Sequence, residues 1–121
     1  RKGKTADFRA PLTPEALHAI ELASQQQRDG YIFPGIKRGV ISEASMARLM
    51  ERRGLEASPH GFRSTLRVWL KESQQASREV AESIIAHQTG SLTERAYNRT
   101  DFLEKRRELM EAWEKHLKSG D

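Results

Sequence analysis

Apolar residues recur three or four positions apart in several separate windows of this sequence, and that spacing limits the fold more than any other feature. Such spacing places apolar side chains on one face of an α-helix. Residues that cap helices precede the windows, and glycine or proline separates them. The chain is therefore expected to be mainly α-helical, with about five helices.

Helix starts are marked by capping residues followed by proline or acidic residues. Thr13–Glu15 combines a hydroxyl cap, a proline at the first helical position and an acid near the positive end of the helix dipole. Gly54 is expected to stop the second helix, and Ser91 to Ala96 to form a short extra one. The main helices are expected to begin near Thr13, Ser42, Ser58, Ser77 and Thr100.

Residues 1–12 give the one strand signal. Phe8, Ala10 and Leu12 alternate with other residues after a basic turn that contains glycine. We therefore expect a short remnant of a β-hairpin at the N-terminus. The helical windows supply the core, and the third is expected to bury Phe62, Leu66, Trp69 and Leu70.

The composition is that of one small, globular domain with a charged surface. The 121 residues are 36% hydrophobic, and the mean hydropathy is -0.76. There are 21 Lys and Arg against 17 Asp and Glu, a formal charge of +4. This excess is compatible with a polyanionic partner, although it also suits many proteins that bind none.

The absence of cysteine excludes a disulfide framework and a thiolate metal site. A reducing cytoplasm is the compartment that this composition favours. No apolar window approaches the length of a membrane span, and no signal peptide opens the chain. Because the chain begins with Arg1 rather than Met, we expect it to be a fragment.

Four side chains together could perform phosphoryl transfer without a metal. His60 and Arg63 lie three apart at the predicted start of a helix, so both can reach one phosphate. The arginine can hold two phosphate oxygens, and a histidine such as His87 can donate hydrogen bonds or move protons. The phenol of Tyr97, once deprotonated, can attack phosphorus.

Each of these residues also has a purely structural interpretation. His60 could cap its helix, and Arg63 could be an ordinary surface charge. His87 could be a C-terminal cap, since the helix dipole favours a cation there, and a lone tyrosine such as Tyr97 usually packs half-buried. A metal bound by the two histidines has little support, because no carboxylates stand at matching spacing.

The order of these residues and the sequence around them favour the catalytic interpretation over the structural one. His60-Gly61-Phe62-Arg63, then His87, then Ala96-Tyr97-Asn98-Arg99 resembles the catalytic domain of the tyrosine recombinases. Within that family the sequence from Ala96 to Trp113 is similar to that of the prophage integrases of the P4-like group. The resemblance covers nearly the whole chain and implies that residues 1–121 are the C-terminal portion of the catalytic domain, as one domain. The family usually has Leu-Gly-His where this chain has Ile85-Ala86-His87.

The resemblance implies a mechanism and a role for each residue. Tyr97 would attack a scissile DNA phosphate, giving a 3'-phosphotyrosyl link and a free 5'-hydroxyl. Arg63 would stabilise the transition state, His60 would accept the proton of the tyrosine or donate to the phosphate, and His87 would be a second donor. Lys4 or Lys2 would match the lysine that protonates the leaving oxygen, unless that lysine precedes Arg1. No cofactor or metal is implied.

The resemblance also implies binding partners, and it implies that this chain lacks part of the active site. The partners would be a double-stranded DNA attachment site, other integrase protomers in a tetrameric synapse, and accessory DNA-bending proteins. Family members use a further arginine near the start of the catalytic domain, with an acidic residue nearby, and nothing before Arg1 is present to supply them. The fragment is therefore expected to bind DNA weakly and to be inactive alone. Two alternatives remain open: a non-catalytic DNA-binding module and an enzyme like the type IB topoisomerases.

Overall fold

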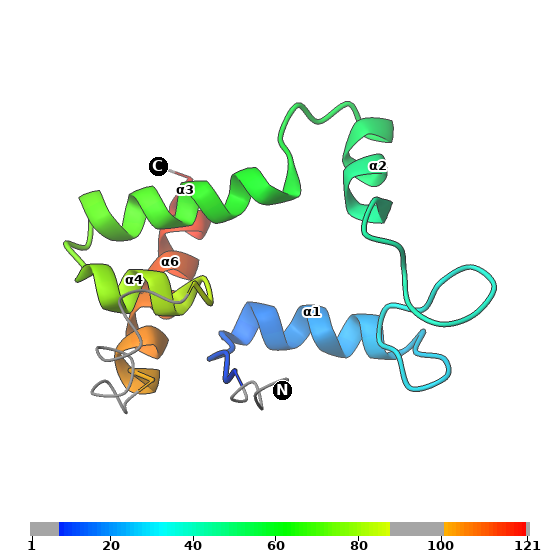
Figure 1. Cartoon of the computed structure of the whole chain (residues 1–121), viewed down its shortest axis with the longest axis horizontal. Helices are drawn as coiled ribbons and strands as arrows, with labels where there is room; N and C mark the ends of the chain where they lie inside the picture. The colour runs from blue at the N-terminus through cyan, green and yellow to red at the C-terminus, as the bar shows by residue number, and fades with distance from the viewer. Residues whose placement is uncertain (1–7, 88–100, 121) are drawn as a thin grey trace, which may run out of the picture. The chain divides into compact units, whose positions relative to one another are not determined.

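A computed structural model describes residues 8–87 and 101–120 of the chain (Figure 1). Among these residues the regular structure is helical, apart from two isolated β-bridges, Arg28 with Tyr31 and Pro34 with Val40. The mainly α class is confirmed, and the described residues contain five helices, the number expected. The described helices are α1 (Pro14–Ser24), α2 (Ser45–Arg52), α3 (Pro59–Glu72), α4 (Arg78–Ile84) and α6 (Leu103–Ser119).

The N-terminal hairpin remnant is not seen in the part of it that the structure describes. Residues 8–12 form no regular element. The other positions expected for it, residues 1–7, lie outside the described residues, as does the short helix expected from Ser91 to Ala96.

Three of the predicted hydroxyl caps are confirmed. The side-chain oxygens of Thr13, Ser58 and Ser77 accept backbone N–H groups three residues later, at 3.3, 3.0 and 3.2 Å. The start predicted near Ser42 is three residues early, because the Ser42 hydroxyl lies 2.9 Å from the Ser45 hydroxyl and caps no amide of α2. Side-chain hydroxyl groups close in sequence therefore set where α1, α3 and α4 begin.

The chain forms two compact units, and the boundary between them falls within α3. Unit 1 comprises Arg1–Leu12 and Arg67–Asp121, and unit 2 comprises Thr13–Leu66. None of the described helices is long and apolar enough to cross a membrane.

Unit 1 contains an apolar core built from the end of α3, α4 and α6 (Figure 1). Leu70 is fully buried, and the Trp69 ring lies 5.0 Å from that of Trp113, centroid to centroid, at 57°. The expected burial of Trp69 and Leu70 is confirmed. Other buried apolar side chains of this core are Val80, Ala81, Ile85 and Leu109.

Arg106 is buried in the same unit and fastens the N-terminal segment to α6. Its Nη2 donates to the carbonyl of Arg9 at 2.6 Å, and its Nη1 donates to the carbonyl of Asp101 at 3.3 Å. The guanidinium also lies 4.8 Å from the centre of the Phe8 ring. Burial lowers the pKa of Arg106 from its ordinary value, while the Asp101 charge opposes that change. Residues 8 and 9 are thereby held against α6.

Unit 2 has little interior. Met50 is its one buried apolar side chain, and Phe62, expected to be buried, is 57% exposed. That prediction is wrong because the segment from Thr13 to Leu66 supplies no facing apolar layer for the first half of α3. Other large apolar side chains left open in this unit are Leu17, Leu22, Phe33, Ile36, Val40, Met46, Leu49 and Leu55.

Asp101 generates a pH-dependent prediction. Nε and Nη2 of Arg9 lie 2.8 and 2.7 Å from its Oδ2. The hydrogen bond from Arg9 lowers the pKa of Asp101 below its ordinary value of 3.8, with burial acting in the opposite direction. A carboxyl whose pKa is depressed in the folded state stabilises the fold above its unfolded pKa, and this contribution is lost as the pH falls through the folded value.

Asp101→Asn should therefore lower the thermal midpoint near neutral pH, and the difference from the wild type should shrink below about pH 4. Circular dichroism melts across that range measure both. Glu108→Gln is the control, because the contact of Glu108 with the described residues is an exposed 3.4 Å pair with Lys105. A difference that stays constant with pH would contradict the assigned role of the Asp101 charge.

Candidate functional site

His60 and Arg63 lie in the first turns of α3, as predicted. The helix begins at Pro59, with Ser58 accepting the Gly61 N–H, so the two side chains are three residues apart on the helix. Both residues are exposed. Arg63 makes no ion pair with any residue that the structure describes. Its charge is therefore available to an anion that reaches this end of the helix.

His87 follows α4 and is held by Glu82. Its Nδ1 lies 2.6 Å from Oε2 of Glu82, and its side chain is 57% exposed. The carboxylate is itself buried, with a side chain only 3% exposed, and Nη2 of Arg67 lies 2.5 Å from its other oxygen. The exposed His87 ring is thus bound to a buried carboxylate, that of Glu82, which also pairs with Arg67.

Sequence reasoning missed Glu82 and Arg67. The available signal was a charge among the apolar residues of α4, since Glu82 directly follows the buried Val80 and Ala81. An acid in such a position is almost never left unpaired. The identity of its partners depended on where α3 lies beside α4.

The backbone at the end of α4 also positions His87. Ala86 has a φ of 58°, in the left-handed region. Its N–H donates to the Ser83 carbonyl at 3.2 Å, and the N–H of His87 donates to the Glu82 carbonyl at 2.8 Å. These two bonds form a Schellman motif, which usually has glycine at the left-handed position. The alanine of Ile85-Ala86-His87 keeps the motif at some cost in strain.

The predicted site residues fall into separate groups in the structure. His60 and Arg63 belong to unit 2 and His87 to unit 1. Tyr97, Lys4 and Lys2 lie outside the described residues. Convergence of these side chains on one phosphate therefore stays a prediction. In residues 8–87 and 101–120 there is also no group of three His, Asp or Glu side chains that could hold a metal ion.

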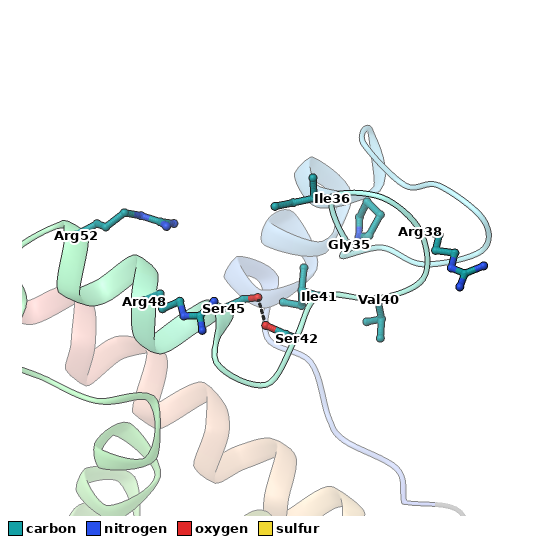
Figure 2. Close-up of a pocket in the computed structure, with 10 residues that line it drawn as sticks. Gly35, Ile36, Arg38, Val40, Ile41, Ser42, Ser45, Arg48 and Arg52 are labelled. Atoms are coloured by element: carbon teal, nitrogen blue, oxygen red, sulfur yellow. Dashed lines mark hydrogen bonds between the residues drawn. The ribbon is translucent and has the colours of Figure 1, made fainter.

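A basic hollow of about 350 Å³ lies within unit 2, between the loop from Pro34 to Ser42 and α2 (Figure 2). We call it the basic hollow because Arg38, Arg48 and Arg52 line it. Arg48 and Arg52 are four apart on α2 and so share a face. Arg38 comes from the loop, and the side chains of Ser42 and Ser45 also line the hollow (Figure 2).

Gly35 shapes the loop that bounds the basic hollow. The N–H of Gly35 donates to the Gly39 carbonyl at 2.8 Å, and Nη2 of Arg28 donates to the Gly35 carbonyl. A Cβ at this position would lie 2.8 Å from the Arg38 carbonyl oxygen and 2.9 Å from that of Val40. Since both are backbone atoms, only glycine fits without moving the loop.

Comparison with known proteins shows similarity to a prophage integrase. Over 120 residues, 95% of this chain, it is 32% identical to a protein of Escherichia coli (strain K12). That relative is described as prophage integrase IntA. The chain spans only 29% of the relative's length. No protein-family model matches the chain, and no solved structure matches it significantly.

The left-handed alanine before His87 generates a stability prediction. Ala86→Gly should raise the free energy of unfolding by about 0.5 to 1 kcal/mol, since glycine relieves the steric cost but loses more entropy on folding. Urea unfolding followed by circular dichroism measures the change. Ala112→Gly, within α6 of the same unit, should instead lower it by about 1 kcal/mol. Equal destabilisation by both variants would contradict the role of the Schellman motif.

Proposed function

We propose that this chain is the C-terminal part of the catalytic domain of a site-specific DNA recombinase of the tyrosine type. The recombinase would integrate or excise prophage DNA. The observation that carries the proposal is the match to a prophage integrase along 95% of the chain. The ordered set His60, Arg63, His87 and Tyr97 supports it, because these types suffice for metal-free phosphoryl transfer.

The proposed reaction exchanges one phosphodiester bond for another. The phenolic oxygen of Tyr97 attacks phosphorus and forms the Oη–P bond, while the bond from phosphorus to the 5' oxygen breaks. His60 takes the phenolic proton, and Lys4 or Lys2 protonates the departing oxygen. The energy of the broken bond stays in the 3'-phosphotyrosyl link. A partner's 5'-hydroxyl reverses the step, so ligation needs no ATP or other cofactor.

Charge stabilisation in this reaction comes from Arg63 and His87. As phosphorus gains a fifth ligand, negative charge grows on its free oxygens. A guanidinium offers two parallel donors to such oxygens, and each well-placed donor is typically worth roughly 3 kcal/mol in the transition state. The exposure of Arg63 and its lack of an ion pair with the described residues are what this role requires.

The basic hollow suits a DNA phosphate away from the cleaved one. Arg38 of the loop and Arg48 and Arg52 on one face of α2 line a space of about 350 Å³, and Ser42 and Ser45 also line it (Figure 2). Contacts of this kind position a protein on the duplex without reading its sequence. The proposed partners are a double-stranded attachment site, other protomers in a tetramer and accessory DNA-bending proteins.

Covalent capture of DNA tests the chemistry. A suicide substrate, which traps the cleaved strand, should become linked to the full-length protein that carries this chain. Tyr97→Phe should abolish the link and leave DNA affinity unchanged, because only the attacking oxygen is removed. Denaturing gel electrophoresis detects the covalent product.

Three outcomes separate the alternatives. Unchanged behaviour of Tyr97→Phe in every assay would indicate a non-catalytic DNA-binding module. Relaxation of supercoiled plasmid without an attachment site would indicate an enzyme like the type IB topoisomerases. The chain alone should bind DNA weakly and form no covalent product, so abundant product from it would refute the proposal that it is an incomplete fragment.

Neighbouring arginines test the basic hollow. Arg52→Gln should weaken binding of duplex DNA and reduce the slope of log affinity against log salt by about 1. Arg53→Gln removes the same charge one residue later, outside the residues that line the hollow, and should leave the slope nearly unchanged. Fluorescence anisotropy over a salt series measures both. If both substitutions changed the slope equally, the arginines of the hollow would act only as general surface charge.

A further inference from the structure

We propose that Glu82 is a positioning residue for His87. Its buried carboxylate fixes a proton on Nδ1 of the imidazole and so leaves Nε2 as the nitrogen that meets the DNA phosphate. The inference rests on the proposed function for the role of His87 in catalysis. The geometry of the pair does not depend on that role.

Glu82 holds His87 at two points. Its carbonyl accepts the His87 N–H at 2.8 Å, which fixes the backbone. Its Oε2 lies 2.6 Å from Nδ1 and fixes the ring. Both contacts come from one residue of α4, so the ring is oriented by the helix and not by a flexible neighbour. The 57% exposure of the His87 side chain shows that this grip leaves the ring open to solvent.

The contact determines which nitrogen carries hydrogen. An ionised carboxylate only accepts hydrogen bonds, so Nδ1 must donate. In the neutral ring Nε2 then bears a lone pair and can only accept. His87 can therefore donate to a phosphate oxygen only as the imidazolium, in which both nitrogens carry hydrogen. The role of hydrogen-bond donor that the sequence suggested for His87 therefore requires the ring to be positively charged.

Arg67 accounts for the burial of this acid. A carboxylate with 3% side-chain exposure needs an opposite charge or several hydrogen bonds. Nη2 of Arg67, from α3, lies 2.5 Å from Oε1, opposite the oxygen that faces His87. Each carboxylate oxygen therefore has its own partner, and the side chain is fixed from both ends.

Packing alone does not explain a glutamate at this position. It follows Val80 and Ala81 in the core of unit 1, where an apolar side chain would be buried at lower cost. A carboxylate repays that cost only through its two polar contacts. One of them holds the exposed imidazole of His87, which the proposed function places at the DNA phosphate.

Glu82→Gln tests the proposal because the amide has one accepting and one donating end. Arg67 can only donate, so the amide oxygen should turn to Arg67 and the NH₂ group to Nδ1. His87 should then change from the Nδ1–H to the Nε2–H tautomer. Long-range ¹H–¹⁵N correlation spectra of the neutral imidazole in this chain report the tautomer directly.

Two controls separate positioning from stability. Glu79→Gln changes an exposed acid of the same helix and should leave the Nδ1–H tautomer in place. Arg67→Gln removes the other partner of Glu82 and should lower the thermal midpoint, yet the carboxylate still accepts from Nδ1 and the tautomer should persist. A wild-type ring in the Nε2–H form, or a tautomer change in both Glu82→Gln and Arg67→Gln, would overturn the inference.

The catalytic consequence is measured in the full-length protein. Glu82→Gln should slow covalent capture of a suicide substrate by about a hundredfold, because the neutral amide no longer pairs with the imidazolium that donates to the phosphate. DNA affinity should stay the same. A tautomer change with an unaltered rate would overturn the positioning role. Covalent capture by Tyr97→Phe would instead refute the proposed function, and would do so whatever tautomer His87 adopts.

Discussion

The negative charge of Glu82, buried in unit 1, is the constraint on which the arrangement around His87 depends. An acid with a 3% exposed side chain must be compensated, and the structure does this with Arg67 on one oxygen and the His87 ring on the other. α3 and α4 are thereby joined through a polar contact beside an apolar core. The position of His87 is a consequence of that compensation.

Arg106 plays a similar part elsewhere in the same unit. Its guanidinium bonds to the Arg9 and Asp101 carbonyls and lies over Phe8, so residues distant in sequence meet on α6. Unit 2 contrasts with this arrangement, since Met50 is its one buried apolar side chain. Its stronger features are polar: the exposed His60 and Arg63 in the first turns of α3, and the basic hollow with its three arginines.

Much of the helical framework was predictable because it is set by local chemistry. Thr13, Ser58 and Ser77 cap their helices with side chains only three residues from the amides they bind, so no distant contact is needed. Ser42 failed as a cap because its hydroxyl bonds to Ser45 instead. Phe62 was expected in the core from helical spacing alone, but spacing cannot show whether a facing layer exists.

The sequence by itself determined the mainly helical class, three of the helix starts and the residue types of the site, including His60, Arg63 and His87. These follow from capping, periodicity and side-chain chemistry over a few neighbouring residues. Only the tertiary structure decided that Glu82 is buried, that Arg67 and His87 share it, and that Arg48 and Arg52 face the loop of Arg38. Such pairings depend on where separate segments lie, and no local pattern encodes that.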